Sequence, residues 1–412
     1  MTSRERVQTA LSFQEPDRVP VDLGGMRSSG INVTTYAALK RSLGIDTPTR
    51  VLDVRLMTAV VEEEVLHRLH ADVLPVDLAG IRAAVSPDSE WIPRTLFDGT
   101  AALFPPGTSI SEGSDGGWTL MNGNGSASSF HMPRDGYYFD DTGFNRGTAI
   151  DPRAFRPGYA IPDEDLRALE SRAGRLFRET DFALLGSGSA ICFLGLSLVP
   201  DRSANVTQGM PDEWMMMLLT EKETCHEMMG RAVDAEIQRM RLVSEAVGDF
   251  CFAWVVASDD SGTQRGEFIG PDLWAEMIKP HYARLCSWVH ENTRMKTFMH
   301  CCGSIPRLIP HLIDAGVDIL NPVQTSAAGM DPSGLKETFG GRIAFWGGGC
   351  DTQSVLPRAT PAEVREHVRE RIRVFAPGGG FVFTQVHNVQ ACVPVENVRA
   401  MFDAAREFGR ST

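Results

Sequence analysis

The sequence lacks the features of a secreted, membrane-spanning or nucleic-acid-binding protein. Its N-terminus carries no apolar signal core, and no run approaches the ~18 consecutive apolar residues of a membrane-spanning helix. Positive charge is in deficit, because 40 Lys and Arg face 53 Asp and Glu, a formal net charge of −13. That balance argues against a nucleic acid or an anionic membrane as the main partner. We therefore expect a cytoplasmic protein with neither of these partners.

Cysteine is too unevenly spaced for a disulfide framework. The chain holds 8 cysteines in 412 residues, a usage that fits reduced thiols in a cytoplasm. Several cysteines lie in apolar or helical surroundings, where a free thiol behaves as a small hydrophobe. Core packing is therefore expected for Cys192, Cys225, Cys251 and Cys286.

Short apolar segments alternate with amphipathic helical segments along most of the chain. Strands are predicted at residues 19–23, 71–76, 182–185, 251–256, 297–299, 317–322, 342–346 and 381–384. Nearly all are followed by helical periodicity, which indicates βα units and a parallel sheet. With about eight such units, the sequence predicts an α/β fold. We expect a (β/α)8 TIM barrel that takes up residues 1–412 as a single domain.

Two of the predicted helices carry specific expectations. Residues 55–70 are predicted as one helix from the spacing of their apolar side chains. Residues 305–313 show the same period and end near Gly316, which suits a C-terminal cap. Pro310 lies inside that pattern and is expected to kink the helix.

Residues 86–150 interrupt the alternation. They are rich in Gly, Ser, Asp and Pro and include aromatic strand fragments at 118–121 and 137–139. The aromatic residues argue against a disordered linker. We predict a β-hairpin insertion that covers one end of the barrel.

The stretch from Phe298 to Ser304 is the most informative about chemistry. A predicted buried strand ends in His300, and Cys302 follows two residues later, before the chain turns at Gly303. Both side chains then lie at the carboxyl end of a strand, where α/β folds place ligands and catalytic groups. An imidazole and a thiolate at this spacing suit zinc. The alternative is a packed histidine beside small buried cysteines.

Further reactive side chains fall at the ends of the predicted strands. They are Arg27, Asp77, Asp259, Asp260, Gln264, Gln324, Cys350, Asp351 and His387. Each alone has an ordinary explanation, since an Asp after a strand is often a helix cap. The carboxyl ends of barrel strands meet at one face, however, so a set of metal-capable groups there favours a functional site.

These features resemble the uroporphyrinogen decarboxylase superfamily, in particular its corrinoid-dependent methyltransferase branch. The segments that carry the resemblance are 4–7, 16–21, 300–304, 316–324 and 394–397. They include His300-x-Cys302-Gly303-Ser304 and Pro394-x-Glu396-Asn397. The resemblance covers most of the chain except residues 86–150.

The resemblance implies a zinc site. Such methyltransferases bind zinc through a His-x-Cys and a cysteine from a later strand, and the zinc lowers the pKa of a thiol substrate that attacks a methyl group on cobalamin. His300 and Cys302 match the first two ligands. The family's third position holds His387 here, as in the decarboxylases, so the third ligand is either Cys350 or His387. Cys392 is a poorer candidate, and Cys301 is expected to face the core.

The resemblance also implies roles and partners. We assign catalytic roles to Asp259, Asp260 and His387, and substrate contacts to Arg27, Gln264, Gln324 and Asp351. The implied cofactors are zinc and cobalamin or another corrinoid, and the substrate is a small molecule. The corrinoid would be free or held by a separate corrinoid-binding protein, which the insertion would contact.

Two alternatives stay open at this point. A cofactor-free decarboxylase of a tetrapyrrole polycarboxylate would need several cations, yet the family's Arg-Gln-Ala-Gly-Arg motif is absent and residues 26–30 hold one arginine, Arg27. A non-catalytic binding protein on the same barrel is the other alternative. The intact His300, Cys302 and Cys350 argue against it.

Overall fold

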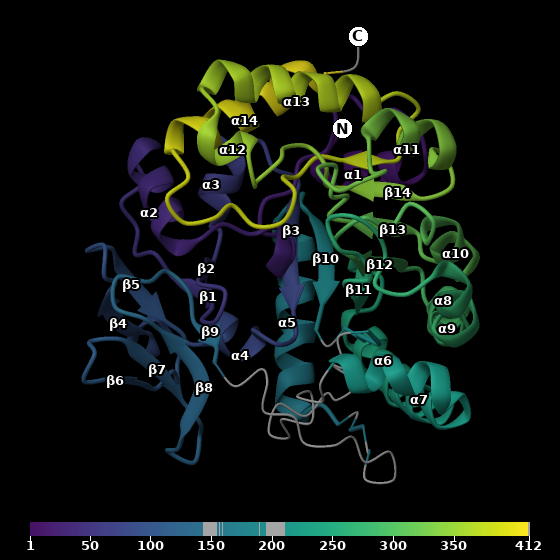
Figure 1. Cartoon of the computed structure of the whole chain (residues 1–412). Helices are drawn as coiled ribbons and strands as arrows, with labels where there is room; N and C mark the ends of the chain where they lie inside the picture. The colour runs from purple at the N-terminus through teal and green to yellow at the C-terminus, as the bar shows by residue number, and fades with distance from the viewer. Residues whose placement is uncertain (143–154, 156, 159, 189, 195–210, 411–412) are drawn as a thin grey trace.

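The computed structural model describes residues 1–142, 155, 157–158, 160–188, 190–194 and 211–410. Its centre is a curled parallel sheet of seven strands in the order β15-β14-β13-β12-β11-β10-β3 (Figure 1). The strands are β3 (Val73–Asp77), β10 (Ala183–Ser187), β11 (Cys251–Ser258), β12 (Lys296–His300), β13 (Ile319–Asn321), β14 (Ala344–Trp346) and β15 (Phe381–Val382). This confirms the predicted α/β class.

The expected eighth strand, 19–23, is reduced to isolated bridges between the two edges of the sheet. Val21 pairs in parallel with Phe383, which follows β15, and its carbonyl accepts the amide of Asp72, which precedes β3. The fully buried Asp72 carboxylate accepts the Val21 amide as well as the side chains of Arg6 and Arg18. The named strands therefore form a curled sheet that is not closed, and its shape is consistent with the TIM barrel that the sequence predicted.

Helices cover the outer face of the sheet (Figure 1), except α1 (Ser3–Leu11), whose Val7 and Leu11 belong to the apolar cluster inside the curl. The others are α2 (Val33–Ser42), α3 (Glu63–Arg68), α4 (Ile81–Val85), α5 (Asp163–Glu179), α6 (Pro211–Thr220), α7 (Lys222–Val247), α8 (Pro271–Met277), α9 (Lys279–Asn292), α10 (Ile309–Asp314), α11 (Pro332–Phe339), α12 (Val355–Arg358), α13 (Pro361–Phe375) and α14 (Val395–Phe408). None of the helices in the described ranges has the length and hydropathy needed to cross a lipid bilayer.

Sequence and structure agree closely at α13. A reciprocal capping box joins Thr360 and Glu363 at its start, so two amides that the helix leaves unpaired are satisfied. Four apolar side chains at helical spacing then lie in the core: Val364, Val368, Ile372 and Phe375.

Residues 55–70 do not form the single helix that their periodicity predicts. Residues 51–59 form an antiparallel hairpin of β1 (Val51–Asp53) and β2 (Thr58–Ala59), and α3 begins only at Glu63. The Asp53 carboxylate accepts the backbone amides of Arg55 and Leu56, which diverts the chain into a turn before a helix can start.

Pro310 does not kink a helix either. Helix α10 begins at Ile309, so Pro310 occupies its first turn. A backbone N–H has no intrahelical partner at that position, and proline is therefore well accommodated. The apolar residues of 305–308 still pack in the core although they precede the helix.

The core has two main parts. One lies inside the curl of the sheet and includes Phe298, Ile319 and Trp346. The other fills the space between the sheet and the helices. Because both faces of the strands are buried, their sequences are nearly continuous apolar runs.

Residues 92–141 form antiparallel sheets. β4 (Ile92–Thr95) pairs with β5 (Ala101–Phe104), and a second sheet contains β6 (Ile110–Glu112), β7 (Trp118–Met121), β8 (Ala127–Met132) and β9 (Asp140–Asp141). They lie to one side of the parallel sheet, next to β1 and β2 (Figure 1). A separate apolar cluster that includes Trp118, Phe104 and Met57 joins these strands to the hairpin.

Candidate metal centre

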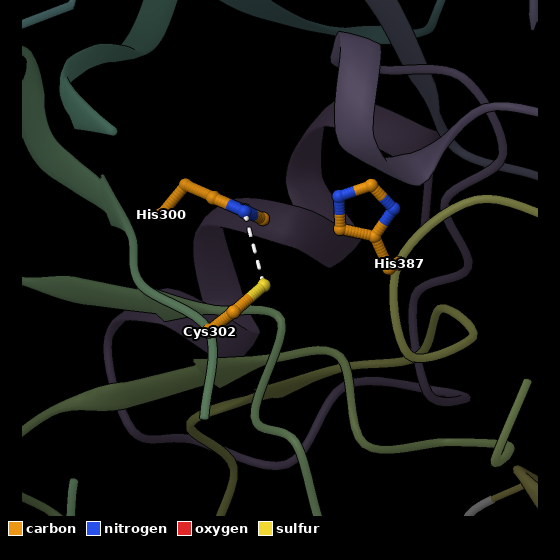
Figure 2. Close-up of side chains that lie close together, drawn as sticks. All are labelled: His300, Cys302 and His387. Carbon is orange, nitrogen blue, oxygen red and sulfur yellow. Dashed lines mark hydrogen bonds between the residues drawn. The ribbon is translucent and has the colours of Figure 1, made fainter. Parts of the chain in front are cut away.

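Three metal-capable side chains converge at the carboxyl end of the parallel sheet (Figure 2). His300 is the last residue of β12, Cys302 follows it, and His387 comes from the loop after β15. One ligand atom from each lies within 4.8 Å of the other two. Cys302 Sγ is 3.3 Å from His300 Nε2.

The His300 ring is held in one tautomer by its neighbour on β13. Asn321 Oδ1 lies 2.6 Å from His300 Nδ1, and Asn321 Nδ2 donates to the Trp346 carbonyl at 2.9 Å. The second contact fixes which end of the amide is oxygen, so His300 must carry its proton on Nδ1. The lone pair of Nε2 is then directed towards Cys302, as metal coordination requires.

A second group contacts the same nitrogen. Ser28 Oγ is 3.1 Å from His300 Nδ1. Ser28 lies in the 3-10 turn Arg27–Ser29, which follows the segment that replaces the first strand. His300 is only 4% exposed, so these contacts and not solvent determine the orientation of its ring.

The position of Cys302 depends on the turn that follows it. Gly303 has φ +92, and a Cβ there would overlap with the backbone of Gly262. The Gly303 amide donates to Gln324 Oε1 at 2.8 Å, and the Cys302 amide donates to Asp260 Oδ1 at 2.8 Å. Two side chains from neighbouring loops therefore hold the backbone on both sides of Cys302.

The Cys302 thiol is protonated in the absence of a cation. Burial raises its pKa above the ordinary value, and the nearby Asp260 carboxylate raises it further. Asp260 Oδ1 also lies 3.6 Å from His300 Nε2. A positive ion between these groups would reverse the effect, because it stabilises the thiolate.

The His387 ring lies opposite His300 and is in the other neutral tautomer, with its proton on Nε2 and not on Nδ1. Its Nδ1 accepts the Asn388 amide at 2.9 Å, so Nε2 carries the proton of the neutral ring. Figure 2 shows the Nε2 edge turned towards His300. Burial and the neighbouring His300 lower the pKa of His387 to about 4. His387 can therefore bind a metal only if its proton moves to Nδ1 and the contact with Asn388 opens.

The donor set fits zinc. Imidazole nitrogen and thiolate sulfur are the ligand types that zinc prefers, and three protein ligands leave a fourth position for a substrate. His300 and Cys302 fit as they stand, and His387 fits after the tautomer change described above.

Cys350, the other predicted third ligand, lies outside this group. It is fully buried, and its Sγ faces the carbonyl of Asp351 at 3.9 Å. Cys301 is buried in the core, as expected, and Cys392 is exposed.

Asp259 is fully buried and occupied by several donors. Its oxygens accept the Tyr282 hydroxyl at 2.6 Å, the Cys192 thiol at 3.2 Å and the amides of Phe193 and Leu194 at 3.0 Å. Burial raises the pKa of Asp259. Its contacts tie the loop after β10 to α9, and the catalytic role assigned to it stays a prediction.

The residues predicted to contact the substrate differ in whether their side chains are already paired within the protein. Arg27 is paired with Asp53 at 2.7 Å and with Asp77 at 3.0 Å. Asp351 accepts the Gln353 amide at 2.8 Å and the Ser354 hydroxyl, so it closes an Asx turn ahead of α12. The exposed Gln264 lies in the loop after β11.

Sequence reasoning missed Ser28 and Asn321. Asn321 stands at the end of a predicted strand, which was a usable signal because polar residues there face the site. Ser28 has no such signal, since a serine in a turn is ordinary.

Comparisons with known proteins bear on the family and the fold. A model of the uroporphyrinogen decarboxylase family matches residues 204–408. No curated protein matches the sequence significantly. Among solved structures 45 chains match, and they include a methyltransferase from Methanosarcina mazei with a TM-score of 0.56 and 16% identity over 99% of both chains. At that identity the likeness shows a shared fold. The match to the uroporphyrinogen decarboxylase family therefore covers the residues that hold His300, Cys302 and His387.

Proposed function

We propose that the protein is a zinc-dependent methyltransferase that moves a methyl group between a corrinoid and a small-molecule substrate. The observation that carries the proposal is the His300 Nε2 lone pair directed at Cys302 Sγ, 3.3 Å away, with His387 completing the group. The shared fold with a methyltransferase over the whole chain supports methyl transfer in general.

His300, Cys302 and His387 would hold the zinc. When bound, zinc supplies positive charge that keeps a thiol substrate deprotonated at neutral pH, and a thiolate is the stronger nucleophile. Asn321 and Ser28 orient His300, and Asp260 and Gln324 hold the backbone around Cys302. These residues preorganise the donors, which lowers the cost of assembling the site.

The methyl carrier would be cobalamin, free or held by a separate corrinoid-binding protein. Transfer to a thiolate would form a sulfur–carbon bond and would leave the electron pair of the broken cobalt–carbon bond on the corrinoid, and the thiol proton would pass to solvent. The antiparallel sheets of residues 92–141 would contact such a carrier.

A decarboxylase is the second candidate, and the matching family model favours it. A tetrapyrrole polycarboxylate needs cations, however, and the Arg27 guanidinium already pairs with Asp53 and Asp77. The methyltransferase proposal therefore agrees better with the charges at the site.

Elemental analysis of protein purified without chelators or a histidine tag tests the proposal. We expect about one zinc per chain, lost in Cys302→Ala and kept in the matched control Cys392→Ala, whose thiol is exposed. The zinc-loaded protein should then demethylate methylcobalamin with a thiol acceptor, seen by absorbance. Zinc retained in Cys302→Ala, or decarboxylation of uroporphyrinogen by metal-free protein, would overturn the proposal.

A further inference from the structure

A buried carboxylate without a cationic partner shares its neighbours with the metal-capable cluster. Asp22 follows Val21 in the segment that replaces the first strand, and its side chain is fully buried. Within the described part of the chain, no Lys, Arg or His is paired with it. Burying an ionised carboxylate without a cation is costly, and such groups are concentrated at functional sites.

Three groups contact the Asp22 carboxylate. Its Oδ1 accepts the Gly25 amide at 2.7 Å, and its Oδ2 accepts the indole N–H of Trp346 at 2.8 Å. The Ser29 side chain is a further hydrogen-bond partner. The fit is close, because a Cβ at Gly25 would lie 2.6 Å from Oδ1. Asp22 therefore joins two elements, the turn of residues 24–29 and β14.

Both of these elements hold the His300 ring. The turn carries Ser28, whose Oγ lies 3.1 Å from His300 Nδ1. Strand β14 ends in Trp346, whose carbonyl accepts Asn321 Nδ2 at 2.9 Å. That contact directs Asn321 Oδ1 to the same nitrogen of His300, at 2.6 Å. The two side chains that contact His300 Nδ1 are therefore placed by the two elements that meet at Asp22.

A second fully buried aspartate, Asp72, shows how a carboxylate that serves the fold alone is accommodated. It lies ahead of β3, at the amino end of the sheet, and pairs with both Arg6 and Arg18. Asp22 has no such cation, so stability alone would favour an uncharged residue at its position. The orientation that its carboxylate imposes on its neighbours explains why a charge is kept there.

We propose that Asp22 is a positioning residue of the metal centre, which holds the turn of residues 24–29 against β14 so that Ser28 and Asn321 together fix the His300 ring. The inference rests on the proposed function in so far as His300 binds zinc. The orientation of the ring itself does not require a metal.

The tautomer of His300 in metal-free protein tests the proposal. In mildly alkaline buffer Asp22 is ionised, because burial raises its pKa only to about 6. Asp22→Asn keeps the shape but turns one acceptor oxygen into an NH₂ donor, which then faces the Trp346 or the Gly25 N–H. The ¹⁵N chemical shifts of His300 should show both neutral tautomers in this variant and a proton on Nδ1 alone in the wild type.

Asp72→Asn is the matched control. It also removes a fully buried negative charge, but at the other end of the sheet. It should lower the stability of the fold and leave the His300 shifts and the zinc affinity unchanged.

Zinc affinity, measured by competition with a chromophoric chelator, tests the connection to the metal. Asp22→Asn should weaken it about three- to tenfold, which is less than the loss of about 10- to 100-fold expected for a direct partner of the ligand. A double-mutant cycle with Ser28→Ala separates positioning from a general loss of stability. The effect of Asp22→Asn should be smaller when the Ser28 hydroxyl is already absent.

Ser29→Ala guards against a folding defect in Asp22→Asn. It removes one of the three partners of the carboxylate and should change the His300 tautomers in the same direction, to a smaller extent. An Nδ1 proton retained in both variants, equal changes in Asp72→Asn, or fully additive losses in the cycle would each overturn the proposal. If the wild type binds no zinc, the zinc assignment fails, while the tautomer comparison still decides the role of Asp22.

Discussion

Asn321 Oδ1 lies 2.6 Å from His300 Nδ1, and this contact determines which nitrogen of His300 is available to a metal. The amide is itself oriented by the Trp346 carbonyl at the end of the next strand. A residue without catalytic chemistry of its own thereby prepares a ligand.

Replacement of Asn321 should therefore weaken metal binding. In Asn321→Leu the Nδ1 proton loses its acceptor, and the zinc affinity should fall about 10- to 100-fold. Competition with a chromophoric chelator measures the affinity, and ¹⁵N chemical shifts of His300 report the tautomer. Asn321→Asp retains the acceptor and should keep the Nδ1–H form. An unchanged tautomer in Asn321→Leu would contradict the argument.

Gly303→Ala should disrupt both stability and the site. The left-handed φ and the overlap of a Cβ with Gly262 would force the backbone beside Cys302 to move. We expect a loss of about 2–4 kcal/mol in the free energy of unfolding and loss of zinc. Gly230→Ala in α7 is the control, because open space surrounds that position, and it should stabilise by about 0.5–1 kcal/mol. Urea denaturation distinguishes the two variants.

Buried neutral histidines should make the protein less stable in mild acid. Burial lowers the pKa of His281, His367 and His387 to about 4 from the ordinary histidine value of 6.5. The unfolded chain therefore binds more protons between these values, so stability is fully present above pH 6.5 and is lost as the pH falls towards 4.

Denaturation curves at several pH values measure this loss, which should amount to about 1–3 kcal/mol for each histidine. His367→Gln keeps an acceptor for the Asp351 amide and removes one titrating group. Its stability should therefore depend less steeply on pH. A slope equal to that of the wild type would exclude a contribution from His367.

Tyr138 should order the loop that carries His387. Its hydroxyl donates to Gln390 Oε1 at 2.7 Å and accepts the Ala391 amide at 2.8 Å. These two bonds join the antiparallel sheets of residues 92–141 to the loop that carries His387. Tyr138→Phe should speed amide hydrogen exchange in residues 387–391, with about 1–3 kcal/mol lost locally. Exchange in α13 serves as the internal reference. Unchanged exchange in the loop would show that the hydroxyl is dispensable.

Much of the fold follows from local patterns. Apolar runs at the predicted strand positions and the capping box at Thr360 depend on nearest neighbours and on the helical period, so sequence alone identifies them. The helix predicted over 55–70 fails because Asp53, which lies before it, captures the amides of Arg55 and Leu56. The spacing of apolar residues carries no information about such a side-chain hydrogen bond.

The sequence by itself determined that His300 and Cys302 share one strand end, because two residues of spacing fix their separation. Only the tertiary structure decided that His387, and not Cys350, joins them. Both follow neighbouring strands, and Cys350 even pairs with Gln385, two residues before His387. His387 has a left-handed φ of 63° and lies with His300 and Cys302, whereas the Cys350 side chain packs in the core. Backbone direction after a strand depends on contacts across the whole sheet, and these exist only once the chain has folded.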